Sequence, residues 1–138
     1  MVFFKHPKII LHVDDDPDDC FLVDQSLRSI DPSIILNQAQ NGKKALNFLT
    51  QAKISGDFPC LIILDMNMPV MNGIDVYKEI RKDPALSEIP IVIFTTSIDD
   101  REVDYCKNEN ITLITKPDSF NEYIERIKKI LAYSHHEP

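Results

Sequence analysis

Five side chains that could share one reaction each follow a short apolar run of this 138-residue chain. The carboxyl ends of parallel strands meet at one edge of a sheet, where open α/β sheets bind their ligands. If the runs are such strands, three acids, a hydroxyl and an ammonium converge on one site. These residues are Asp14 and Asp15 after the first run, Asp65 after the third, Thr95 after the fourth and Lys116 after the fifth.

The acids at this predicted site need a positive charge near them. Two carboxylates about 4 Å apart repel each other by about 4 kcal/mol at an effective dielectric of 20. A hard divalent cation such as Mg²⁺, which takes oxygen ligands and keeps several waters, offsets this repulsion. Lys116 supplies a further positive charge. We therefore expect Mg²⁺ to bind at Asp14, Asp15 and Asp65.

A simpler interpretation of the first acids is a solvated helix start, because the helix dipole stabilises carboxylates in a first turn. This interpretation explains Asp16, Asp18 and Asp19 well. It explains Asp14 and Asp15 poorly, because they precede the predicted helix. The metal site remains the favoured interpretation for these two residues.

A carboxylate beside a divalent ion, a lysine and a threonine can attack phosphorus and form an acyl phosphate. The metal and Lys116 would neutralise the phosphoryl oxygens, and Thr95 would donate a hydrogen bond to one of them. The chain has three glycines and no glycine-rich phosphate loop. We therefore expect the phosphoryl donor to be a phosphoramidate, an acyl phosphate or a phosphorylated protein, and not a nucleotide.

The elements that must hold these side chains alternate along the chain. Short aliphatic runs are typical of strands buried on both faces, and the segments between them have helical spacing. This alternation predicts an α/β fold with a doubly wound parallel sheet. We expect strands at Ile9–Val13, Ile34–Leu36, Cys60–Leu64, Ile91–Phe94 and Ile111–Ile114, and helices over 17–29, 43–52, 74–82, 99–107 and 120–131. We also expect Asn108 to take the left-handed conformation after the fourth helix. Phe120 should be the first residue in the apolar stripe of the fifth helix.

The composition is that of a single globular domain, with a core over about 8–132 and a tail over 133–138. Lys and Arg number 15 against 22 for Asp and Glu, which gives a net charge of -7. Phosphate backbones and anionic lipid would repel such a surface. We therefore expect neither nucleic acid nor a membrane as a direct partner.

The three cysteines are far apart and form no CxxC pair, which is typical of a reducing compartment. The apolar start, Met1–Phe4, is too short for the hydrophobic part of a signal peptide. No apolar run approaches the length of a membrane span. These features predict a cytoplasmic protein.

Four motifs, in order along the chain, give a resemblance to a known family. They are Val13–Pro17 (VDDDP), Leu64–Gly73 (LDMNMPVMNG), Phe94–Ser97 (FTTS) and Thr115–Pro117 (TKP). With them the chain resembles the receiver domain of two-component response regulators over nearly its whole length. The resemblance implies a flavodoxin-like fold with strand order 2-1-3-4-5.

The resemblance also implies a role for each site residue. Asp65 matches the phospho-accepting aspartate. Asp14 and Asp15 match the acidic pair that holds Mg²⁺ with it, Asp15 being the more direct ligand. Asn67 matches the position whose backbone carbonyl completes the metal shell.

Two further residues match the family's phosphoryl contacts. Thr95 matches the hydroxyl that follows the phosphoryl group on activation, and Lys116 matches the lysine that pairs with it. The family usually has a cis bond between Lys116 and Pro117. The Asn72–Gly73 pair would ordinarily indicate a hairpin turn, but the helical pattern that follows it favours a loop that enters the third helix.

Two positions depart from the family pattern. Leu113 stands where the family often has the aromatic residue of its switch, and Lys107–Asn110 lacks the usual glycine after the fourth helix. Both lie on the face where receivers dimerise or bind partners. The sequence leaves monomer against homodimer open, with Leu113, Tyr123 and Ile124 as candidate contacts.

The predicted function is a phosphorylation switch. Asp65 takes a phosphoryl group from a phosphohistidine on a sensor histidine kinase or a histidine phosphotransfer protein, and the change alters which downstream protein is bound. The chain would catalyse only its own phosphorylation and dephosphorylation, with no cofactor besides Mg²⁺. Since the chain ends soon after the fifth helix, it resembles the single-domain regulators. The segments Asp83–Pro90 and Thr95–Ser97 resemble those of the receivers found together with bacteriophytochrome-type kinases.

Three alternatives remain. Leu113 would suit a scaffold that keeps the site and binds its partner constitutively. A phosphatase with an aspartate nucleophile needs a second acid two residues later, where this chain has Asn67. A flavodoxin-like electron carrier is disfavoured, because the carboxylates would repel a flavin phosphate and the chain has no tryptophan to stack on a flavin.

Overall fold

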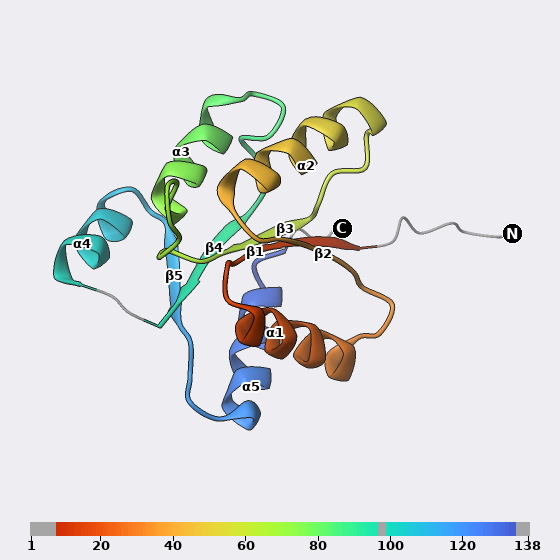
Figure 1. Ribbon diagram of the computed structural model, residues 1–138, viewed down its shortest axis with the longest axis vertical. Coiled ribbons are helices and arrows are strands. Elements are labelled where there is room, and N and C mark those ends of the chain that lie inside the picture. The colour runs from red at the N-terminus through yellow and green to blue at the C-terminus, as the bar shows by residue number, and fades with distance from the viewer. Residues whose placement is uncertain (1–7, 97–98, 135–138) are drawn as a thin grey trace, which may run out of the picture.

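The computed structural model describes residues 8–96 and 99–134, so Ser97 and most of the predicted tail lie outside the described residues. A five-stranded parallel sheet crosses the middle of the molecule and has helices on both faces (Figure 1). Its strand order is β2-β1-β3-β4-β5, as predicted. The strands are β1 (Ile9–Val13), β2 (Ile35–Ala39), β3 (Leu61–Leu64), β4 (Ile91–Thr95) and β5 (Thr112–Thr115); the helices are α1 (Pro17–Ile30), α2 (Gly42–Ser55), α3 (Gly73–Lys82), α4 (Asp100–Asn108) and α5 (Phe120–Leu131).

The sheet separates two apolar clusters because successive side chains of a strand point to opposite faces. Ile63 of β3 packs with α1 and α5 on one face, and Leu64 packs with α2 and α3 on the other. Helices α1 and α5 lie together below the sheet in Figure 1, and α2 and α3 lie above it. None of the helices in the described ranges is long and apolar enough to cross a bilayer.

The expectation that all strands are buried on both faces is wrong for the two edge strands. The three central strands are almost wholly buried, whereas β2 and β5 keep exposed or half-buried residues. Strand β2 also begins one residue later and runs three residues further than predicted. Its polar residue Gln38 is held in the strand by hydrogen-bond partners, because its amide donates to the Cys20 carbonyl at 2.8 Å and lies 3.2 Å from the His12 ring.

Two details at helix ends also differ from prediction. Asn108 is still helical, and Asn110 has the left-handed conformation with φ 56°, because the carbonyls near the end of α4 are capped by the Glu109 amide. Phe120 is 41% exposed, and the buried stripe of α5 begins at Tyr123.

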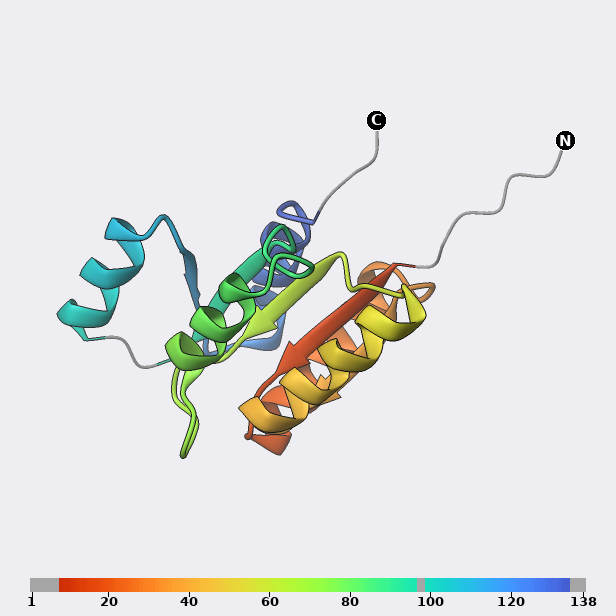
Figure 2. The same cartoon turned by 90° about the horizontal axis from the view of Figure 1, so that it is seen from above.

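Side-chain caps begin the helices next to the carboxyl ends of the strands. Asp16 caps α1 by accepting a hydrogen bond from the Asp18 amide at 2.9 Å, and Pro17 occupies the first turn. Asn72 and Asp75 form a capping box at the start of α3. Figure 2 shows the loop before α3 protruding at the end of the sheet where α1 begins. The caps therefore fix where each loop leaves the sheet edge.

Gly73 is the first residue of α3 and lies against the backbone that follows β3. Its amide donates to the Met66 carbonyl at 2.9 Å. A Cβ at this position would collide with the Asp65 carbonyl oxygen and lie 2.9 Å from the Met66 Cα. Glycine is therefore required here, because only a missing side chain lets α3 approach the backbone of Asp65.

Replacement of this glycine tests the close approach. We expect Gly73→Ala to lower the free energy of unfolding by roughly 2–4 kcal/mol, because backbone must move to admit the methyl group. Urea unfolding followed by circular dichroism measures this change.

The matched control is Gly42→Ala, at the first residue of α2. A Cβ there would meet side-chain atoms and not backbone, at 2.6 Å from the sulfur of the flexible Met71 side chain and 2.8 Å from Cγ2 of the buried Val76. We expect this variant to lose less than half as much stability. Equal losses in the two variants would contradict the assigned role of Gly73.

Candidate functional site

The sheet positions the site residues by extending its hydrogen-bond ladder one step past the strands. The Asp65 amide donates to the Val13 carbonyl at 2.9 Å, and the Lys116 amide donates to the Thr95 carbonyl at 2.9 Å. The Asp14 amide likewise donates to the last carbonyl of β2 at 3.0 Å. These three side chains therefore leave the sheet at neighbouring points of one edge, as the sequence predicts.

The Lys116 ammonium lies among carboxylates from three segments of the chain. Its Nζ is 2.7 Å from Asp14 Oδ2, 2.9 Å from Asp19 Oδ2 and 3.4 Å from Asp65 Oδ1. The Lys116 side chain is 3% exposed, so water screens these contacts little. An ammonium has three N–H donors, and each has a carboxylate acceptor here.

The acids of the site could hold a metal ion. Asp14, Asp15 and Asp65 offer one oxygen each, and these oxygens lie within 4.8 Å of one another. Asp14 and Asp65 are buried, whereas Asp15 is exposed. An all-oxygen donor set that opens to water suits Mg²⁺, which keeps part of its hydration shell. The residues present therefore fit the predicted ion.

Asn67 and Thr95 are two further site residues, and their side chains contact each other. The Asn67 side-chain amide donates to the Thr95 hydroxyl at 3.3 Å. Thr95 is completely buried, whereas Asn67 is exposed between two buried methionines, Met66 and Met68. The structure thus brings Asn67 to the site, and it shows a side-chain contact that the sequence did not predict.

The site shifts the ionisation of its acids in opposite directions. Burial is the main cause that raises the pKa of Asp65 to about 6. The charge of Lys116 lowers this pKa in part, and the charge of Asp14 raises it. Burial also raises the pKa of Asp14, but the His12 and Lys116 side chains outweigh burial and leave that pKa below its ordinary value. The folded protein therefore disfavours the ionised form of Asp65 and favours that of Asp14.

Lys116 remains charged at neutral pH. Burial alone would lower the pKa of its ammonium, but hydrogen bonds to Asp14 and Asp19 and the charges of Asp14 and Asp65 raise it above the ordinary value. The site therefore keeps a fixed positive charge beside Asp65. This charge would face the phosphoryl oxygens of an acyl phosphate.

Asp19 and Tyr123 are members of this cluster that the sequence interpretation missed. Asp19 was expected to be a solvated first-turn acid, yet it bonds to Lys116 and lies 3.4 Å from the Tyr123 hydroxyl. The spacing contained a signal, because Asp19 precedes Val23 and Leu27 by four and eight residues and so shares their buried stripe.

His12 is a third residue that sequence reasoning missed. It is 1% exposed, and its Nε2 lies 3.7 Å from Asp14 Oδ2. It occurs within an apolar run, two residues before Asp14, and therefore on the same face of the chain. That alternation was the available signal.

The peptide bond between Lys116 and Pro117 corrects an expectation of the resemblance. The bond is trans, since the described part of the chain contains no cis peptide bond. The ladder bond from the Lys116 amide to the Thr95 carbonyl already directs the lysine toward the site. Leu113, at the position of the family's aromatic residue, is half-buried and packs against the cluster under α2 and α3.

Comparison with known proteins gives the family. The model of the response regulator receiver domain matches residues 10–128, so the chain belongs to this family. Response regulator Rcp1 of Synechocystis sp. is 38% identical over 104 residues, which make up 70% of this chain and 67% of that protein.

Solved structures agree with this assignment. The phosphorylated cyanobacterial phytochrome response regulator RcpA is 27% identical and superposes with a TM-score of 0.83 over 94% of both chains. The Mn²⁺-bound form of response regulator Rcp1 is 30% identical, with a TM-score of 0.79 over 92% of this chain and 94% of that one. The predicted family and the predicted flavodoxin-like receiver fold are thus confirmed.

The raised pKa of Asp65 has a consequence for stability. An unfolded aspartate ionises near 3.8 and the folded Asp65 near 6, so the free energy of unfolding falls as the pH rises from about 4 to about 6. At pH 7, in buffer with a metal chelator, we expect Asp65→Asn to raise the free energy of unfolding by roughly 2–3 kcal/mol. Urea unfolding over a pH series measures the difference.

The gain should disappear below about pH 4, where the wild-type carboxyl is protonated in both states. Asp18→Asn is the control, because Asp18 is an exposed acid at the same end of the sheet. We expect it to change the free energy of unfolding at pH 7 much less than Asp65→Asn does, because the Asp18 side chain is exposed to water. A constant difference between Asp65→Asn and wild type at all pH values would contradict the role of burial.

Proposed function

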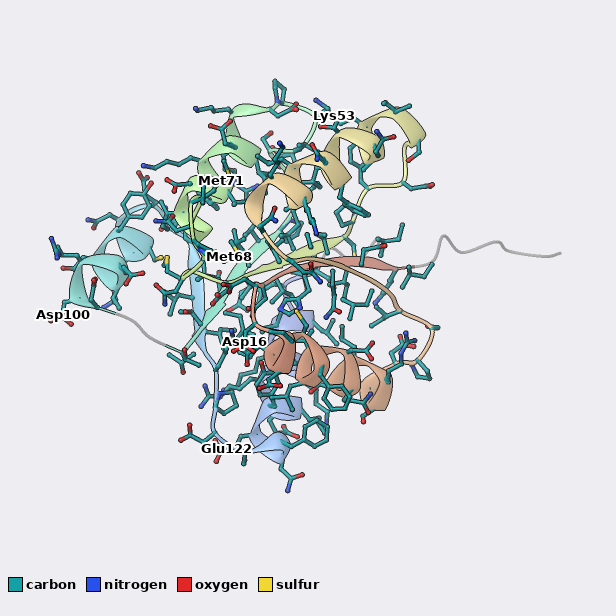
Figure 3. All side chains as sticks on the ribbon, viewed as in Figure 1. Asp16, Lys53, Met68, Met71, Asp100 and Glu122 are labelled. Atoms are coloured by element: carbon teal, nitrogen blue, oxygen red, sulfur yellow. The ribbon has the colours of Figure 1, made fainter. Side chains whose placement is uncertain are left out.

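We propose that this receiver is a phosphorylation switch whose phospho-acceptor is Asp65. The observation that supports it is the grouping of Asp65, two further acids and the charged Lys116 at one sheet edge. Figure 3 labels Asp16 at the start of α1, next to this edge. The grouping places a nucleophile next to a cation that can neutralise a transferred phosphoryl group.

In the proposed reaction an Asp65 carboxylate oxygen attacks the phosphorus of a phosphohistidine. The new O–P bond forms as the P–N bond breaks, and the freed imidazole takes up a proton. Mg²⁺, held by Asp14, Asp15 and Asp65 with the Asn67 carbonyl, would neutralise phosphoryl charge when bound. Lys116 and Thr95 hold the phosphoryl oxygens of the product. Attack of water on the phosphorus later breaks the O–P bond to Asp65, releases inorganic phosphate and restores the carboxylate.

The donor we propose is a sensor histidine kinase or a histidine phosphotransfer protein. The likeness to Rcp1 and to the phytochrome response regulator RcpA supports a kinase of the bacteriophytochrome type. The chain then acts in the cytoplasm and catalyses only its own modification. The output is a change in protein partner on the side of α4, β5 and α5, where Leu113 lies.

A constitutive scaffold is the second candidate. Leu113 supports it, because this half-buried aliphatic side chain packs against the core and provides no aromatic ring to reorient with Thr95. The scaffold predicts the same partner affinity with and without a phosphoryl group. A tenfold difference in affinity would rule the scaffold out.

The proposed chemistry is tested by intact mass after incubation with Mg²⁺ and acetyl phosphate. We expect one phosphoryl adduct on the wild type, because Asp65 can attack a small acyl phosphate as well as a phosphohistidine. Asp65→Asn should give no adduct while remaining folded by circular dichroism. A metal chelator should suppress the wild-type adduct.

Two outcomes would contradict the assignment. An adduct that persists on Asp65→Asn would place the phosphoryl group on another residue. A wild type that binds Mg²⁺ and gives no adduct would favour the constitutive scaffold.

A further inference from the structure

Asp19 is the residue of the site cluster to which the proposed chemistry gives no role. It lies in the first turn of α1, and its side chain is 18% exposed, whereas its neighbour Asp18 is exposed to water. Its two oxygens contact different elements, since Oδ2 is 2.9 Å from Lys116 Nζ and Oδ1 is 3.4 Å from the Tyr123 hydroxyl. Asp19 thus connects the end of β5 to α5.

The three acceptors of Lys116 are not equivalent. Asp65 has the longest distance, 3.4 Å, so the ammonium is held nearer to Asp14 and Asp19 than to the phospho-acceptor. A phosphoryl group on Asp65 brings new oxygens that need an N–H donor. The N–H that faces Asp65 at 3.4 Å can pass to one phosphoryl oxygen, but a second phosphoryl oxygen can be bound only if the bond to Asp14 or to Asp19 lengthens.

Asp19 is the acceptor that can release the lysine at least expense. Asp14 is completely buried, and its Oδ1 also accepts the Asp16 amide at 3.0 Å. Asp19 is partly open to water, which can replace the lost N–H, and it keeps the Tyr123 hydroxyl as a donor. The exchange therefore takes place between Asp19 and the phosphoryl group.

Tyr123 is placed to respond to this exchange. It is 2% exposed, and its ring meets Phe94 edge-on, with centroids 5.3 Å apart. The ring is thus fixed, while its hydroxyl hydrogen bond to Asp19 is long at 3.4 Å. A carboxylate that loses its ammonium partner becomes a better acceptor for this hydroxyl.

We propose that Asp19 is a positioning residue that competes with the phosphoryl group for Lys116, and that Tyr123 on α5 responds when Lys116 leaves Asp19. The proposal rests on Asp65 being the phospho-acceptor. The Asp19 carboxylate holds the ammonium away from Asp65 and so slows phosphoryl transfer to Asp65; we call this effect the brake. The proposal also gives α5 a contact that depends on phosphorylation.

The first experiment compares Asp19→Asn with Asp18→Asn in the rate of adduct formation with acetyl phosphate and Mg²⁺. Both variants remove one negative charge from the same helix turn, but only Asp19 touches Lys116. We expect Asp19→Asn to react roughly three- to tenfold faster than Asp18→Asn, since part of a charge-assisted hydrogen bond to Lys116 is released. Equal rates, or a slower Asp19→Asn, would overturn the brake.

The second experiment follows tyrosine absorption in the near ultraviolet when beryllofluoride, a phosphoryl mimic, is added with Mg²⁺. The chain has four tyrosines and no tryptophan, so the signal is not masked by indole. We expect a difference spectrum for the wild type that is lost in both Tyr123→Phe and Asp19→Asn and kept in Asp18→Asn. A spectrum unchanged by Asp19→Asn would overturn the response of Tyr123.

A spectroscopic readout on metal-free protein completes the test. The tyrosine spectrum of Asp19→Asn should differ from that of wild type, and this difference should vanish in the Tyr123→Phe background. No difference would show that Asp19 and Tyr123 are uncoupled and would overturn the proposal. An unreactive wild type would instead count against Asp65 as acceptor, so the two failures are distinguishable.

Discussion

One buried ammonium among three carboxylates is the interaction on which this site depends. Lys116 is 102, 97 and 51 residues away along the chain from Asp14, Asp19 and Asp65. Only a completed parallel sheet brings such distant segments to one edge, so the apolar core must supply the energy that gathers these charges. The site in turn opposes folding, because Asp65 is held where its ionised form is disfavoured. Stability is given up at this edge, which is typical of functional sites.

Local patterns predicted the alternating strands and helices and the grouping of most site residues, whereas the strand order followed from the resemblance to the receiver family. Apolar runs identify the central strands, and the rule that ligands bind at their carboxyl ends groups Asp14, Asp65 and Lys116 before any coordinates are known. Asp19 was missed for a physical reason, since a first-turn acid satisfies the helix dipole whether or not it also meets a partner. Which partner it meets depends on how far Lys116 reaches across α1, and periodicity does not encode that distance.

The wrong predictions at the ends of strands and helices share one cause. Tertiary contacts outweigh the conformational preferences of the local sequence. Gln38 stays in β2 because its amide finds acceptors on α1 and β1, although a polar residue usually ends such a run. At Gly73 the local signal is misleading, because an Asn-Gly pair usually indicates a hairpin turn. Here the glycine is needed because the backbone of α3 packs closely against that of Asp65. Leu113 is a position where the family pattern was not informative, because this side chain packs against the apolar cluster that includes Cys106 of α4.

The edge strand β2 affects how this protein behaves at high concentration. Its sequence, Ile-Leu-Asn-Gln-Ala, carries no charge, and Ile35 is 44% exposed. Edge strands without lysine, proline or a bulge are templates for pairing between molecules. The net charge of -7 keeps neighbouring molecules apart through mutual repulsion. The negative charge of the whole surface therefore prevents association through β2. Protonation of the acids, or a high salt concentration, removes this repulsion.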